Sequence, residues 1–132
     1  MGRRYLLKDE AEAALRRGKA VECFLGPCER EGQLGIRHIA LSLVDGAFVA
    51  SLYETADFGS ASFLDLYAFG PLDPNLEQGD ADSVLSFAAL DDFLAFIGQE
   101  WPGSDLRLTN EGVLQDEYAD YVAIKLDART PV

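Results

Sequence analysis

The feature that most constrains the fold is a pair of alternating apolar and polar runs, residues 36–44 and 47–54, on either side of Asp45-Gly46. An Asp-Gly pair supplies the two positive φ angles of a type I′ turn, which joins antiparallel strands directly. Such a turn also fixes the register, because every other cross-strand pair follows by counting outward. We therefore predict an antiparallel hairpin at the centre of the sheet. A parallel sheet is disfavoured because it needs a helix between successive strands.

The predicted register separates two faces of the hairpin. One face is apolar and ends in an expected ion pair between Arg37 and Glu54. On the opposite face His38, the only histidine, is expected to pack on Tyr53 at the protein surface. The apolar pairs of the first face are Leu43 with Phe48, Leu41 with Ala50 and Ile39 with Leu52.

Periodicity in the rest of the chain predicts three helices. Asp9 and Glu12 have the spacing of a capping box and Gly18 is a typical C-cap, so a short helix is expected between them. A third helix is expected from an N-cap at 109–110 to about residue 127, although 121–126 also alternates as a strand would. The second helix is predicted by an apolar stripe of Leu90, Phe93, Leu94, Ile97 and Trp101.

Strand periodicity adds to the hairpin on both sides. Alternation predicts strands at 20–25, 62–69 and 83–87, with a further edge strand at 105–108. Gly26-Pro27 is expected to end the first of these strands, so that the polar residues that follow, 28–35, form a loop.

These elements together predict an α+β fold. We expect one domain over residues 1–132, with an antiparallel meander sheet of about four to six strands packed against two or three helices. Residues 128–132 are expected to form a loose tail. The sheet and the second helix should share a core of Leu41, Leu43, Phe48, Leu52, Phe93, Leu94 and Ile97.

Charge is distributed unevenly along the chain. Residues 38–106 carry twelve carboxylates and no Lys or Arg, so the whole formal charge of −12 lies in this segment. A negative field repels phosphates and anionic lipid headgroups, which disfavours nucleic acid and membrane surfaces as partners. Surplus carboxylates also keep a protein soluble, but that purpose is usually served by both signs interspersed.

The segregation of charge therefore favours a basic protein partner, since electrostatic complementarity speeds and orients association. The preferred function is a non-catalytic acidic binding protein, of the inhibitor or immunity type. The expected contacts are acids around an aromatic anchor: Asp57, Asp65, Tyr67, Asp73, Glu77, Asp80 and Asp82.

The alternative is a small-molecule-binding protein or an enzyme with a pocket on the aromatic face of the sheet. Its polar groups would be His38, Tyr53, Asp65 and Tyr67, which combine imidazole, phenol and carboxylate in one row. The sequence contains no catalytic motif and no nucleotide-binding fingerprint, so an enzyme is the less favoured interpretation.

No metal or other cofactor is expected. Cys23 and Cys28 lack the second pair of thiolates that a structural zinc site requires. The run that begins at Asp73 starts like a calcium loop, but Gln78 and Val84 stand where an EF-hand has Gly and a bidentate Glu. The two thiols are expected to be reduced and partly buried, with a strained bridge or a redox pair as the alternative.

The sequence favours a cytoplasmic location. Arg3-Arg4 resembles the twin-arginine export signal, but the acids that follow from Asp9 onward replace the apolar stretch which that signal needs. No apolar run approaches the roughly 20 residues of a membrane span. The pattern does not specify an oligomeric state.

Overall fold

In the computed structural model, β2 (Gln33–Val44) and β3 (Ala47–Ala56) form the hairpin that the sequence predicts. Asp45 and Gly46 have φ angles of 50° and 81°, both positive as a type I′ turn requires. Ten residue pairs follow from this turn without a shift, and every predicted pair is among them. The register is therefore confirmed along the whole hairpin.

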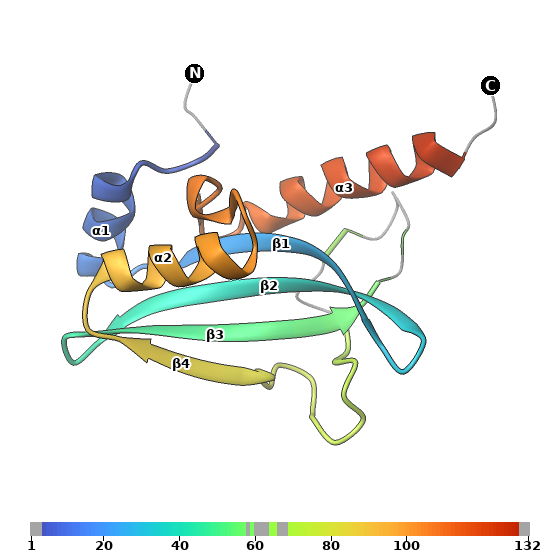
Figure 1. Cartoon of the computed structure of the whole chain (residues 1–132), viewed down its shortest axis with the longest axis horizontal. Coiled ribbons are helices and arrows are strands. Elements are labelled where there is room, and N and C mark those ends of the chain that lie inside the picture. The colour runs from blue at the N-terminus through green and yellow to red at the C-terminus, as the bar shows by residue number, and fades with distance from the viewer. Residues whose placement is uncertain (1–3, 58, 60–63, 66–68, 130–132) are drawn as a thin grey trace.

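The structure describes residues 4–57, 59, 64–65 and 69–129, with the backbone alone for 126–129. Within these residues five strands form one antiparallel sheet in the order β4-β3-β2-β1-β5 (Figure 1). The architecture is α+β, an antiparallel sheet packed against three α-helices, as predicted. The remaining elements are α1 (Lys8–Arg16), β1 (Val21–Arg30), β4 (Ser83–Phe87), α2 (Leu90–Glu100), the 3₁₀-helix η2 (Ser104–Leu106), β5 (Thr109–Asn110) and α3 (Leu114–Arg129).

The strand β1 is longer than predicted, because Gly26-Pro27 bends it without ending it. A bulge before Gly26 shifts the register, and Gly26 has a φ of 96° that favours glycine. Pro27 has no N–H to donate, but β5 pairs only with the first two residues of β1, so the outer side of β1 has no described partner there. The predicted loop 28–35 is wrong: a second turn with two positive φ angles, Glu31-Gly32, joins β1 to β2.

The other predicted strands have mixed outcomes. The strand predicted at 83–87 is β4, which pairs with β3. The strand predicted at 105–108 is wrong, because Ser104 Oγ donates to the Ile97 carbonyl at 2.8 Å and holds the chain against α2 as η2. The predicted strand 62–69 falls mostly outside the described residues, and its described members are not in a strand.

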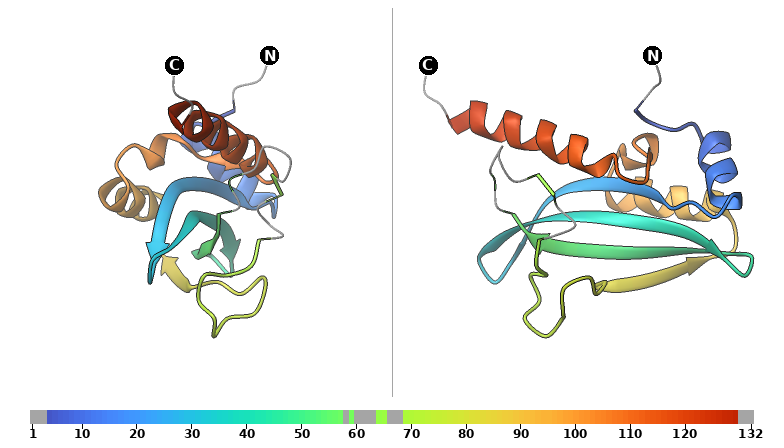
Figure 2. Two further views of the ribbon diagram at one scale, coloured as in Figure 1. Left: turned by 90° about the vertical axis from the view of Figure 1, so that its right-hand side faces the viewer. Right: turned by 180° about the vertical axis from the view of Figure 1, so that it is seen from behind.

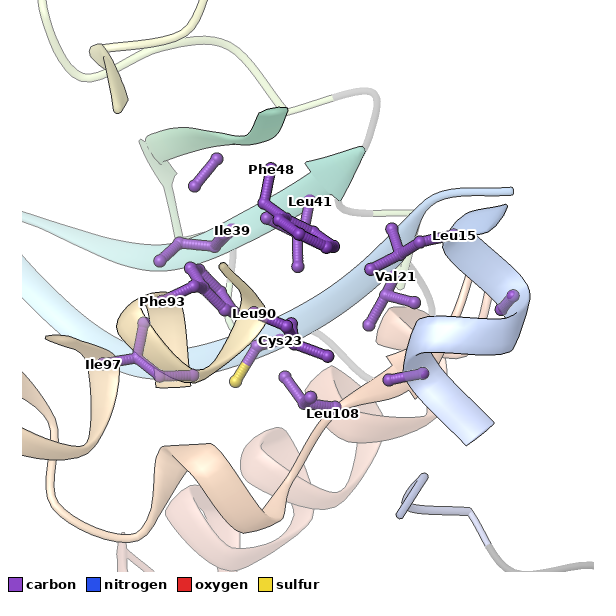
Figure 3. Packing of buried hydrophobic residues seen from close by; sticks show 13 residues of the cluster. Leu15, Val21, Cys23, Ile39, Leu41, Phe48, Leu90, Phe93, Ile97 and Leu108 are labelled. Carbon is purple, nitrogen blue, oxygen red and sulfur yellow. The ribbon is translucent and has the colours of Figure 1, made fainter. Parts of the chain in front are cut away.

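One face of the sheet packs against α1 and α2. We call it the α1/α2 face; it contains the apolar row of the hairpin and Val21 and Cys23 of β1. Figure 3 shows how Phe93 and Ile97 of α2 and Leu15 of α1 meet this row. The predicted core residues all belong to this cluster, with Leu43, Leu52 and Leu94 only partly buried at its border.

The opposite face packs against α3, which runs along β1 (Figures 1 and 2). Leu114, Tyr118 and Val122 of α3 contact Phe24 and Ile36 of the sheet. Residues 121–126 are helical, so the strand alternative is excluded, and 128–129 continue the helix that was expected to have ended. We call this side the α3 face; its sheet residues are Glu22, Phe24, Ile36, His38, Ala40, Ser42, Val49, Ser51, Tyr53 and Thr55.

Candidate functional site

A cavity of about 260 Å³ opens on the α3 face, next to the end of the sheet that α3 covers. Four of its residues come from the hairpin, because alternate residues of β2 and β3 project from the same face. The others come from β1, from the segment 69–80 and from the turn before α3. The lining consists of Glu22, His38, Ala40, Tyr53, Thr55, Phe69, Pro71, Gly79, Asp80 and Glu111.

The floor of the cavity is the stacked pair of His38 and Tyr53. Their ring centroids lie 5.0 Å apart with an interplanar angle of 14°. The packing of the two rings is confirmed, but His38 is not a surface residue, since only 5% of it is exposed. Burial lowers the pKa of His38 to about 4. At neutral pH the imidazole is therefore uncharged and adds no positive charge to the cavity.

Three carboxylates surround this floor. Glu22 is buried, and its Oε1 accepts the Gly112 N–H at 2.9 Å. Asp80 is exposed and its Oδ2 accepts the Glu77 N–H at 3.0 Å. Glu111 lies at the turn before α3 and is also exposed. No Lys or Arg is found among the described residues that line the cavity.

Thr55 adds a polar group to the wall of the cavity. The residue is 7% exposed, and its hydroxyl has no hydrogen-bond partner within the described structure. A buried hydroxyl without a partner is costly, typically about 1–3 kcal/mol. It is therefore available to a ligand that enters beside the His38–Tyr53 stack.

Asp57, a predicted partner contact, instead holds α3 to the sheet. Its side chain is 1% exposed and accepts Lys125 Nζ at 2.8 Å and Tyr118 Oη at 2.6 Å. Burial alone would raise the pKa of Asp57, but these hydrogen bonds outweigh it and hold the pKa below its usual value. Burial of Tyr118 and its hydrogen bond to Asp57 raise the pKa of the Tyr118 hydroxyl.

Two further residues that the sequence predicts to contact a partner, Asp82 and Asp73, instead bond within the protein around the loop between β3 and β4. Asp82 Oδ2 accepts the Glu54 N–H at 2.7 Å, and burial raises the pKa of this carboxyl. Asp73 accepts the Asn75 N–H at 2.9 Å and pairs with Arg30 at 3.3 Å. Both carboxylates are therefore engaged within the protein.

The remaining predicted contacts are spread over the surface. Asp65 is exposed and accepts Gln115 Nε2 at 3.4 Å, and it does not line the cavity. Glu77 is exposed beside Asp80, which does line it. Tyr67 lies outside the described residues. Of the residues proposed for the alternative pocket, the structure therefore brings together His38 and Tyr53.

Folding mixes the charges that the sequence keeps apart. Arg37 Nη2 lies 2.6 Å from Glu54 Oε2, as predicted, and Lys8 Nζ lies 2.6 Å from Asp91 Oδ1. Together with the Asp57 and Asp73 pairs, four acids of 38–106 therefore meet bases from the two flanks of the chain. The acidic segment is not one continuous unneutralised face.

The remaining polar chemistry is sparse. Within the described ranges no three His, Cys, Asp or Glu side chains gather closely enough to hold a metal ion. Cys23 and Cys28 are buried and unbridged, and burial raises their thiol pKa values to about 12 and about 11. No helix among the described residues is long and apolar enough to cross a bilayer.

Comparison with known proteins gives no match to a family model, a curated protein or a solved structure.

Proposed function

We propose that the protein is a non-catalytic binding protein that engages a basic protein partner, of the inhibitor or immunity type, through the cavity on the α3 face. The observation that carries this proposal is the set of three carboxylates, Glu22, Asp80 and Glu111, around a cavity that no described cation lines. A cationic side chain of a partner would be attracted by all three carboxylates. It would also lie beside the His38–Tyr53 stack and within reach of the Thr55 wall.

The contact set proposed here is narrower than the acidic segment as a whole. Asp57, Asp73 and Asp82 are excluded because none of them lines the cavity and each is bonded to another part of the fold. Glu77 is retained in the contact set because it is exposed and its N–H donates to the side chain of Asp80, which lines the cavity. We also place the protein in the cytoplasm, since two cysteines are too few for the disulfide framework of a small exported domain.

A small cationic molecule is the second candidate ligand. The cavity, at about 260 Å³, is slightly below the roughly 300–1,000 Å³ of typical small-molecule sites. A single Lys or Arg side chain or a small amine therefore suits it better than a large ligand. The chemistry of recognition is the same in both cases, and the partner is favoured by the negative charge of the entire chain.

The test compares two variants of equal net charge in a pull-down from an extract of the source cells. One variant removes the two exposed acids that line the cavity and the exposed acid beside them, with Asp80→Asn, Glu111→Gln and Glu77→Gln. The matched control removes three exposed acids elsewhere, with Glu29→Gln, Glu100→Gln and Asp116→Asn. Both sets place an amide where each carboxylate was, so the side-chain shape and one acceptor oxygen are kept while the charge is removed.

The proposal predicts a basic partner that the native protein and the control variant retain at low salt and release at high salt. The cavity variant should lose that partner at low salt as well. Equal retention by both variants would contradict the cavity as the contact. Equal loss of the partner by both variants would mean that binding depends on the net charge of the protein and not on the cavity.

A further inference from the structure

The strand β4 is a free edge of the sheet among the described residues, and its composition is unusual for such a position. In Figure 1 it forms the outermost strand, and no described strand pairs with its outer side. Natural proteins usually protect free edges with charged residues, proline, bulges or a covering segment. The sequence Ser-Val-Leu-Ser-Phe has no charge, no proline and no glycine, and its pairing with β3 has no bulge.

The hairpin turn determines which main-chain groups of β4 face outward. A two-residue turn makes Val44 and Ala47 a hydrogen-bonded pair, so alternate residues of β3 from Phe48 onward direct their N–H and C=O groups toward β4. The contacts beyond β4 agree, because the Glu54 N–H donates to Asp82 and the Asp82 N–H donates to Leu52 O.

The residues of β4 that pair with these positions use their main-chain groups toward β3. They are Ser83, Leu85 and Phe87. Val84 and Ser86 therefore direct their N–H and C=O groups away from the sheet, where the described structure supplies no main-chain partner. Val84 is 60% exposed and Leu85 39% exposed, so neither the edge nor its side chains are covered.

Charge decides between the possible occupants of this edge. Glu77 and Asp80 precede β4 and Asp92 follows it, and none of the three has an ion pair within the described residues. Antiparallel pairing with a second copy would place the acids before one β4 opposite the acids after the other. Each copy also carries a net charge of −12, which opposes self-association. An extended basic segment is attracted at both ends of the strand instead.

We infer that β4 receives an extended segment of the basic partner as an additional antiparallel or parallel strand. This inference rests on the proposed function and specifies how the partner binds. Main-chain hydrogen bonds to Val84 and Ser86 supply the register, and basic side chains of the added strand meet the flanking acids. The Val84 side chain lies on the α3 face, opposite Ser51, so the edge and the cavity are parts of one side of the sheet.

The test uses a blocked peptide of alternating lysine and valine as the probe. Val84→Pro removes the outward N–H without removing a bond to β3, because that N–H does not face β3. Val84→Thr is the matched control, since it keeps the N–H and the shape of the side chain. Circular dichroism and the unfolding midpoint establish that each variant is folded before binding is measured by titration calorimetry.

We expect the peptide to bind the native protein and Val84→Thr with similar affinity. Its affinity for Val84→Pro should be lower by about tenfold or more. Hydrogen exchange should then show the Val84 and Ser86 amides protected only when the peptide is bound. Affinity that is unchanged by Val84→Pro but lost in the Glu77, Asp80 and Glu111 variant would overturn the edge inference and leave the proposed function intact. Equal binding of a peptide with glutamate in place of lysine would overturn the basic occupant. Protection that rises with protein concentration alone would show that a second copy covers the edge, and would overturn the inference.

Discussion

Acid should destabilise this protein through His38 well before its ordinary carboxylates are protonated. Burial lowers the pKa of His38 from 6.5 to about 4. In the unfolded chain the imidazole binds a proton below about pH 6.5, whereas the folded protein resists that proton down to about pH 4. The unfolded state therefore gains stability as the pH falls through this window. The contribution of the uncharged His38 to the free energy of unfolding is therefore fully present above about pH 6.5, and it is progressively lost as the pH falls toward about 4.

The size of this loss follows from the shift. Between about pH 7 and about pH 4.5 the free energy of unfolding should fall by about 2 kcal/mol on account of His38 alone. His38→Phe is the informative substitution, because it keeps an aromatic ring against Tyr53 and removes the titrating group. Urea denaturation of both proteins at the two pH values gives the comparison. The readout is the change with pH in each protein, so a constant offset between the two proteins does not matter.

The native protein should lose about 2 kcal/mol more than His38→Phe over this interval. Asp57, whose pKa is lowered in the folded protein, contributes stability that is lost only as the pH falls through still lower values, and it does so in both proteins. Equal losses in the two proteins would show that His38 does not cause this loss of stability. They would mean that the carboxylates around the cavity offset the burial of the imidazole and let it titrate normally.

Three further predictions concern positions outside the cavity. Gly35→Ala should lower the free energy of unfolding by about 2 kcal/mol, because its new methyl group would lie 2.6 Å from a backbone carbonyl oxygen, whereas Gly70→Ala meets nothing within 4 Å and should be nearly neutral. Asp57→Asn should cost about 2 kcal/mol or more by breaking a buried ion pair, and it should leave partner capture unchanged if this acid is structural. A thiol reagent should leave Cys23 and Cys28 unmodified in the folded protein and modify both after denaturation, since both thiols are buried with raised pKa values. Rapid labelling of the folded protein, or a Gly70→Ala penalty as large as that of Gly35→Ala, would contradict these assignments.

The central hairpin could be predicted pair by pair because a two-residue turn leaves no freedom in the register. The turn at Glu31-Gly32 also has two positive φ angles, but the sequence does not indicate it, because Glu is not a typical residue before Gly in such turns. Pro27, four residues earlier, also favours an end to the strand before this turn is reached. The extent of β1 was therefore underestimated. Pro27 is tolerated because its position in the sheet lacks a described partner on the outer side, which only the strand order reveals.

The candidate site was only partly predictable. His38 and Tyr53 could be placed together because they belong to the hairpin. Glu22 and Glu111 were missed because they come from β1 and from the turn before α3, and no local pattern connects them with the hairpin. The one available signal was a glutamate that alternates with the apolar residues of a buried strand. Charge along the sequence did not identify the site, because folding pairs Asp57 with a base from the distant α3.

Binding of a cationic group in the cavity can be measured by an NMR titration of the labelled protein with the blocked amino acid Nα-acetyl-lysine amide. The neutral analogue N-acetyl-norleucine amide, which has the same carbon chain, is the control. Saturable shifts are expected with the lysine compound alone, for the rings of His38 and Tyr53 and for the Gly112 amide, which donates to Glu22. These shifts should be absent in the variant with Glu77→Gln, Asp80→Asn and Glu111→Gln. Equal shifts with both ligands, or undiminished shifts in that variant, would contradict recognition of a cationic group by the cavity carboxylates.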